Sequence, residues 1–191
     1  MPLPEGRHLE LLDEAIAADG AAHRALLDGD RAGARSALMS AAELYRGSWE
    51  AAPPGSYGRL IGMLKAAVLA GGGVEEAAYV RAAVAEPASP PAWYALALSA
   101  LAEGRDEDAL RAAEGMRGGS DSFVRTAGAI SALAARDAAA YEAGVREIVA
   151  DFEGRSQHLT GVPIADTALL LEVFAERRGL ACHPASALLP A

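Results

Sequence analysis

Apolar positions recur along most of this chain at helical spacing, and polar or turn-forming residues divide them into short segments. The clearest unit covers residues 89–116. Its first half places on one helical face Trp93, Leu96, Ala97, Ala100 and Leu101. Ser89 is a favourable N-cap, Pro90 suits the first helical position, and Gly104 suits the end of the helix. An apolar stripe with acidic residues in its first turn follows, formed by Ala109, Leu110, Ala113 and Met116. The unit therefore predicts two helices joined by a tight turn.

The rest of the chain repeats this unit in weaker form. The predicted hairpin turns are Gly29-Asp30, Gly72-Gly73, Gly104-Arg105 and Arg136-Asp137. The last three recur at intervals of 31 or 32 residues, whereas the first interval is 43 residues. We therefore expect an insertion near Pro53-Pro54. A period of this size predicts helical hairpins that stack, each burying its apolar face against its neighbours.

These patterns predict a single all-α domain over residues 1–191, an α-solenoid of stacked antiparallel helical hairpins with about nine helices. The expected hairpins cover residues 7–50, 56–86, 89–117 and 120–153, after a frayed start at 1–6. A loop at 154–163 should precede a terminal helix at 164–178 that caps the stack. That helix is apolar around much of its circumference, so we expect it to be buried. The tail at 181–191 should be mobile or lightly docked.

The hairpin at 89–116 resembles a tetratricopeptide repeat. That repeat has Trp, Leu-Gly, Tyr and Ala at set spacings. Here the positions are occupied by Trp93, Leu96-Ala97, Ala100 and Ala109, so Ala97 stands in place of the Gly and Ala100 in place of the Tyr. The resemblance implies a tetratricopeptide-like superhelix that is degenerate in sequence.

Charge and composition narrow the class of partner. The net charge is −9, aromatic residues make up 5% of the chain, and no basic patch is visible. Because a nucleic-acid-binding protein needs such a patch, we expect no nucleic-acid partner. An acidic surface would steer a basic protein toward this one, although the same charge is also explained by solubility alone.

From the cysteine content and the hydropathy of the sequence we expect a cytoplasmic protein. Cys182 is the sole cysteine, which leaves no disulfide framework and no thiolate metal site. No signal pattern opens the chain and no apolar run is long enough to span a membrane, so we expect no membrane partner. The histidines lack metal-ligand spacing, and Gly71-Gly72-Gly73 lacks the Gly-Lys-Ser/Thr that completes a phosphate loop. We expect no metal and no cofactor.

Residues 151–180 carry a second resemblance. The features are Asp151-Phe152-Glu153, the loop at 158–163, Ile164-Ala165-Asp166 and Arg178-Gly179. Together they resemble the end of the Immunity 49 family of bacterial polymorphic-toxin immunity proteins. That resemblance implies a helical-repeat protein that binds a cognate toxin and neutralises it. It implies no catalytic residues.

His158, Thr160 and Asp166 form the most suggestive polar cluster. A His and an Asp near a loop could perform acid–base chemistry or bind a metal. The structural alternative is that Thr160 or Asp166 caps the last helix while His158 bonds to a nearby backbone group. We interpret the cluster chiefly as structural, and keep His158 and Asp166 as candidate partner-binding residues.

Three further partner-binding candidates come from the repeat. In a tetratricopeptide-like hairpin the position after the Trp often faces the concave groove, so Tyr94, Leu98 and Arg125 are predicted to line it. Trp49, Tyr57 and Tyr94 could anchor a partner, since aromatic residues dominate interface hot spots. We predict, however, that Trp93 and Trp49 fill the core.

The leading functional hypothesis is a non-catalytic protein, an immunity protein that binds a basic toxin domain. The first alternative is a helical-repeat adaptor in a bacterial regulatory complex. The second is a small enzyme that uses His158 and Asp166, and a deep polar pocket joining these two residues would favour it. The sequence leaves the oligomeric state open.

Overall fold

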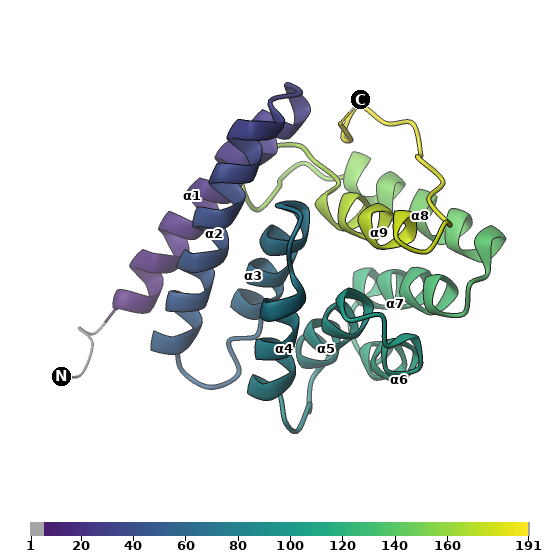
Figure 1. Cartoon of the computed structure of the whole chain (residues 1–191), viewed down its shortest axis with the longest axis horizontal. Coiled ribbons are helices and arrows are strands. Elements are labelled where there is room, and N and C mark those ends of the chain that lie inside the picture. The colour runs from purple at the N-terminus through teal and green to yellow at the C-terminus, as the bar shows by residue number, and fades with distance from the viewer. Residues whose placement is uncertain (1–5, 191) are drawn as a thin grey trace.

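The chain folds into helices joined by short turns, as the computed structural model in Figure 1 shows. The structure describes residues 6–190, and within this range it has nine helices and no strand. The helices are α1 (Arg7–Leu27), α2 (Arg31–Ala51), α3 (Gly58–Leu69), α4 (Val74–Ala83), α5 (Pro90–Ala102), α6 (Asp106–Met116), α7 (Asp121–Ala134), α8 (Ala138–Glu153) and α9 (Asp166–Glu176). The predicted all-α hairpin fold is confirmed. Most of the expected frayed start at 1–6 lies outside the described residues.

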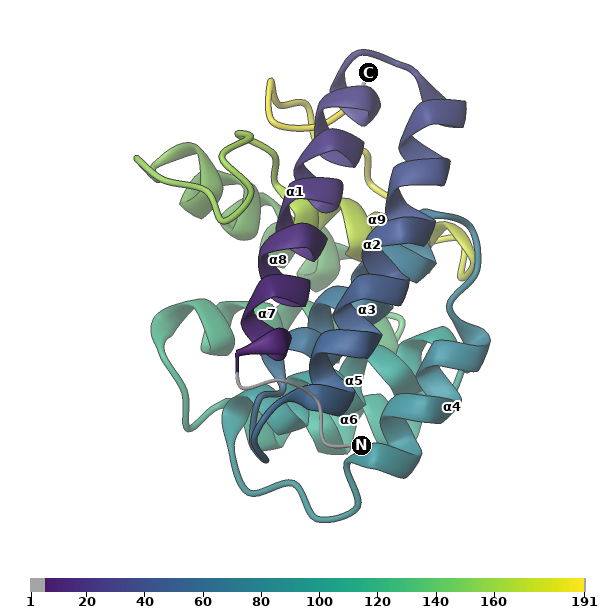
Figure 2. The same cartoon turned by 90° about the vertical axis from the view of Figure 1, so that its left-hand side faces the viewer.

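Consecutive helices pack in pairs, and the pairs stack on one another. The long pair α1 and α2 forms one side of the molecule, and α5 with α6 and α7 with α8 form the other hairpins (Figures 1 and 2). Helix α3 packs more extensively on α2 and α5 than on its hairpin partner α4. The second hairpin is therefore splayed, and α3 lies at the centre of the stack.

The turns and helix starts follow local chemistry. Gly104 and Arg136 occupy equivalent turns, with φ of 71° and 58°. This is the left-handed conformation, which is uncommon for a residue other than glycine, such as Arg136. The side chains of Asp30 and Asp137 cap α2 and α8 by accepting bonds from main-chain N–H groups. The predicted cap by Ser89 is wrong in detail: it occupies the N-cap position in an extended conformation, but its side chain makes no capping bond.

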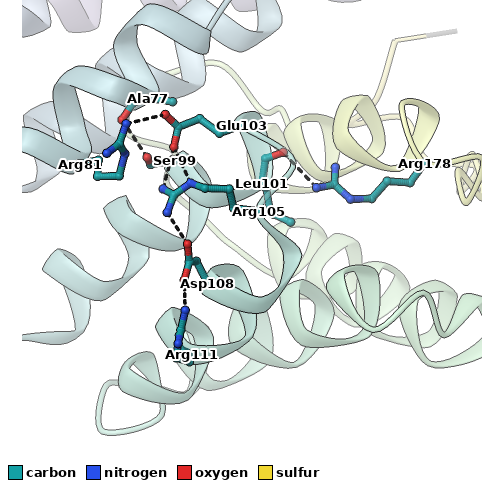
Figure 3. Close-up of polar contacts among 9 residues, drawn as sticks. All are labelled: Ala77, Arg81, Ser99, Leu101, Glu103, Arg105, Asp108, Arg111 and Arg178. Atoms are coloured by element: carbon teal, nitrogen blue, oxygen red, sulfur yellow. Dashed lines mark hydrogen bonds and ion pairs between the residues drawn. The ribbon is translucent and has the colours of Figure 1, made fainter.

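A chain of ion pairs fastens the turn between α5 and α6 (Figure 3). Arg105 bonds to Glu103 and Asp108, Arg81 of α4 reaches Glu103 at 3.3 Å, and Asp108 also pairs with Arg111. Deeper in the same region, Ser99 Oγ donates to the carbonyl of Ala77 at 2.8 Å. These contacts join α4, α5 and α6 where the stack turns.

The last helix does not cap the end of the stack, which corrects one prediction. The loop extends to residue 165, so α9 begins at Asp166 instead of 164 and ends at Glu176 instead of 178. The chain turns back, and α9 packs against α3 and α8 (Figure 1). Its side chains Leu170, Leu171 and Phe174 are fully buried. A helix that is apolar on most sides is more stable between two neighbours than at an exposed end.

A buried carboxylate holds the C-terminal tail against α9. Glu172 accepts hydrogen bonds from Tyr141 Oη at 2.8 Å, from Cys182 N at 3.1 Å and from His183 N at 2.6 Å. Further along, the carbonyl of Leu188 accepts from Ala165 N at 2.9 Å. The described part of the tail therefore docks along α9 although it forms no helix. Ala191 lies outside the described residues.

Candidate functional site

A pocket of about 250 Å³ lies where α1 meets the loop at 154–165 and the start of α9. Its walls come from α1, α3, α5, α7, α8 and α9 and from the loop at 154–165. Four of the five residues proposed from the sequence line it, namely Tyr94, Arg125, His158 and Asp166. They lie far apart along the chain, so only the return of the loop and α9 across the stack brings them together.

The innermost charges are an ion pair between α3 and α9. Lys65, the sole lysine of the chain, bonds to Asp166, and its Nζ also donates to Thr167 Oγ1 at 3.2 Å. The side chains of Lys65 and Asp166 are only 15% and 23% exposed. Burial by itself would raise the pKa of Asp166, but the charge and hydrogen bond of Lys65, with smaller contributions from His23 and Thr167, together lower that pKa. The same attraction raises the pKa of Lys65 against the effect of burial. Both groups are therefore charged.

A second polar chain joins α1 to the loop. His23 Nε2 lies 3.5 Å from Asp19 Oδ1, and His23 Nδ1 lies 3.0 Å from Thr160 Oγ1. Tyr45 Oη donates to Asp19 Oδ2 at 3.3 Å. Burial lowers the pKa of His23 and raises that of Asp19, in both cases because it disfavours the charged form. The loop also lies close to α1 at Gly20, where a Cβ would come 3.0 Å from the carbonyl oxygen of Thr160.

Two arginines and an exposed leucine form the rim. Asp151 forms an ion pair with Arg125 at 3.0 Å and accepts a hydrogen bond from Arg155 at 2.6 Å. The guanidinium of Arg155 lies 3.8 Å from the centre of the Phe152 ring. Leu159, at the tip of the loop, is 78% exposed, the largest exposed fraction among the large apolar side chains of the described chain.

Two buried polar atoms of the described residues have no hydrogen-bond partner, and both belong to residues that line this pocket. They are Tyr94 Oη and His158 Nδ1. Tyr94 is only 8% exposed, and burial raises the pKa of its phenol. Thr167 lies close enough to influence that pKa, but the contact lacks the geometry of a hydrogen bond. Buried groups of this kind normally have a partner, which can be a protein group, ordered water or a bound molecule.

Leu98 is not a groove residue, which corrects the sequence prediction. It is 0% exposed and belongs to the core, because α5 is covered on nearly every side. Tyr94 is also buried, but it does line the pocket. The expectation that Thr160 or Asp166 caps the last helix is wrong as well, since the N-cap of α9 is Ala165 and makes no side-chain bond.

Trp49 and Trp93 are only partly buried, although both pack against the core. The prediction that they fill the core is therefore only partly correct. Trp49 stacks on Tyr57 with ring centres 5.7 Å apart. Trp93 lies over Gly115 of α6. Both pack at the edge of the core, away from the pocket lining.

Sequence reasoning missed Lys65, Asp19 and His23. A usable signal existed for Lys65: it is the chain's one lysine, and it lies within the apolar run Leu60–Leu69 of the printed sequence. A charged side chain inside such a run requires a buried partner. Asp19 and His23 are spaced four residues apart, which places them on one helix face. Nothing in the sequence indicated that the loop would cover them.

The carboxylates of the pocket differ from its unpaired groups in how they are bonded. Each carboxylate of the pocket is already engaged, whereas the two unpaired atoms belong to a phenol and an imidazole. No group of three or more His, Cys, Asp or Glu side chains in residues 6–190 is placed to hold a metal. Within the same range no helix is long and apolar enough to cross a membrane.

Comparisons with protein-family models, with curated proteins and with solved structures find no match to this chain. The resemblance of residues 151–180 to the immunity family therefore stays a prediction.

Proposed function

We propose that this chain is a non-catalytic binding protein that recognises a protein partner at the pocket rim. One observation carries the proposal: Leu159 is 78% exposed at the tip of a loop that also contributes His158 and Thr160 to the pocket. Arg and aromatic side chains, the types enriched in interface hot spots, line the pocket beside it, and Leu159 adds exposed apolar surface to them. The covering partner would bury it and close the pocket.

The partner we propose is a bacterial toxin domain, which this chain would neutralise by direct binding in the cytoplasm. Two features support this choice. Residues 151–180, which resemble the end of immunity proteins, include Leu159 and much of the rim. The net charge of −9 suits a basic partner, because charge complementarity accelerates encounter.

Co-expression with a candidate toxin domain, such as the product of a neighbouring gene, tests the proposal. The chain should restore growth of a bacterium that produces the toxin, and the two purified proteins should bind each other. Leu159→Asp should weaken that binding more than tenfold, because loss of an interface anchor costs about 2 kcal/mol or more. Isothermal titration calorimetry measures the change.

Leu9→Asp is the matched control. Leu9 is 53% exposed and lies ten residues before Asp19 on α1, about 15 Å along the helix axis. It should leave both rescue and affinity unchanged. Failure of the folded wild-type chain to bind or to rescue would reject the toxin role, and binding of a regulatory protein instead would favour the adaptor alternative.

An enzyme is the second candidate, because the pocket does join His158 to Asp166. The pairing of Asp166 with Lys65 weakens this reading, since a carboxylate held in an ion pair is a poor base. The test is turnover of chromogenic ester and phosphoester substrates. An activity abolished by His158→Ala and retained by Leu159→Asp would establish the enzyme over the binding protein.

A further inference from the structure

We infer that the pocket binds an uncharged amide or hydroxyl group carried on a flat apolar body, and that it selects against anions and cations. This inference deepens the proposed function and rests on it, since the partner would present such a group to the pocket.

The charges of the pocket are matched among themselves. Its lining contains three cations, Lys65, Arg125 and Arg155, and three carboxylates, Asp19, Asp151 and Asp166. Lys65 pairs with Asp166, and both arginines pair with Asp151. Asp19 is held by His23 and by the hydroxyl of Tyr45. A charged ligand at the inner end of the pocket would have to separate Lys65 from Asp166, and separating a buried pair is costly.

The groups left for a ligand are a phenol hydroxyl and an imidazole nitrogen. Burial raises the pKa of Tyr94, so its hydroxyl keeps its proton and can donate, while its oxygen can also accept. His158 Nδ1 donates or accepts according to its tautomer. A primary amide carries a donor and an acceptor in one planar group, and a hydroxyl carries both on one atom. Either can bond to Tyr94 Oη or to His158 Nδ1 without adding charge.

The walls fit a flat apolar body. Tyr94 meets Phe123 edge to face with ring centres 6.0 Å apart, and the His158 ring lies 6.2 Å from that of Phe152. Ile148, Val162 and Ile164 add aliphatic surface. A volume of about 250 Å³ is below the range of about 300–1,000 Å³ usual for drug-sized ligands. The pocket therefore suits a single side chain or a small fragment.

Three probes of one shape and different charge test the inference: benzamide, benzoate and benzamidinium. Titrations of the full chain followed by NMR should show that benzamide binds with a Kd of about a few millimolar, as expected for a fragment of this size. Benzoate and benzamidinium should bind at least about tenfold more weakly. Chemical-shift changes should include Tyr94 and His158.

Tyr94→Phe keeps the ring and removes the hydroxyl, so it should weaken benzamide binding about tenfold. Tyr79→Phe is the matched control, because Tyr79 bonds to Glu50 away from the pocket lining, and it should leave the affinity unchanged. A charged probe that binds as well as benzamide would overturn the inference. Saturable binding of none of the three would also overturn it, and would mean that ordered water satisfies the unpaired atoms.

The two proposals fail separately. If the toxin binds through Leu159 but benzamide does not bind, the pocket chemistry is wrong and the partner role stands. If benzamide binds but no protein partner does, the chemistry stands and the pocket serves a small molecule instead.

Discussion

At the scale of single residues, Lys65 joins two helices that lie far apart in the sequence. It lies in α3, at the centre of the stack, and joins that helix to Asp166 at the start of α9. The pair lies at the inner end of the pocket and holds the returning helix in register. A buried pair of this kind is weak evidence for stability, but breaking it leaves one charge buried without a partner.

Lys65→Met should therefore cost about 3–5 kcal/mol in the free energy of unfolding, because it leaves Asp166 unpaired. Adding Asp166→Leu to this variant should recover most of the loss, since the apolar pair removes the buried charge. Urea denaturation followed by circular dichroism measures both changes.

Arg146→Ala is the control for this pair, because Arg146 and Glu142 form an exposed i,i+4 pair on α8. Such pairs contribute about 0.3–0.5 kcal/mol. A loss of similar size in Lys65→Met and Arg146→Ala would show that Lys65 is not a structural centre.

At the scale of elements, the close approach of two helices sets how they pack against each other. Helices α5 and α6 form the hairpin that the sequence indicated most clearly, and they meet where Trp93 lies over Gly115. A Cβ at Gly115 would come 2.3 Å from a carbon of that ring, which is far inside van der Waals contact. Glycine is required here for space and not for a special φ.

Gly115→Ala should destabilise the protein by about 1–3 kcal/mol, the usual cost of overpacking. Gly128→Ala, in α7, is the control: a Cβ there meets nothing within 4 Å, so the better helix propensity of alanine should stabilise by up to about 1 kcal/mol. Thermal unfolding measures both variants.

If Trp93 is the cause, the double variant Gly115→Ala with Trp93→Leu should lose less stability than the sum of its single changes. A stabilising effect of Gly115→Ala alone would mean that the ring moves aside freely.

At the scale of the whole molecule, polar contacts join α1 and α3 to the C-terminal loop, to α9 and to the tail. The loop at 154–165 bonds to α1 through Thr160 and His23, and α9 bonds to α3 through Asp166 and Lys65. The tail then returns along α9 to Glu172. Global stability should consequently depend on the protonation of groups at this junction.

His23 gives that dependence a defined sign. Burial lowers its pKa below the usual 6.5, so the unfolded chain takes up this proton more readily than the folded one. The contribution of His23 to stability is therefore complete above pH 6.5 and is lost as the pH falls toward the folded pKa. The raised pKa of Asp19 acts in the opposite direction, and its contribution is lost as the pH rises above 3.8.

Comparing the wild type with His23→Asn isolates the contribution of His23 to the pH dependence of stability. The difference in unfolding free energy between wild type and variant should narrow as the pH falls from about 7.5 to about 5.5, by at most about 1.4 kcal/mol per pH unit. Urea titrations at four pH values measure it. A constant difference would show that His23 takes up its proton equally in both states.

Much of the fold could be predicted from the sequence. The turn at Gly104, the start at Pro90 and the cap at Asp137 act on their own neighbours, so the helices they delimit begin and end close to the predicted residues. Four of the candidate site residues also line the pocket. Leu98 was misplaced because a repeat pattern gives the face on which a residue lies but not what covers that face.

The sequence by itself determined the helices and the pairing of neighbours, because helical periodicity, caps and turn residues are local signals. Only the tertiary structure decided that the loop turns back and that α9 packs between α3 and α8. That choice depends on burying apolar surface between segments about one hundred residues apart in the chain, as Lys65 and Asp166 are. No local pattern records such a contact, and it is this contact that creates the pocket.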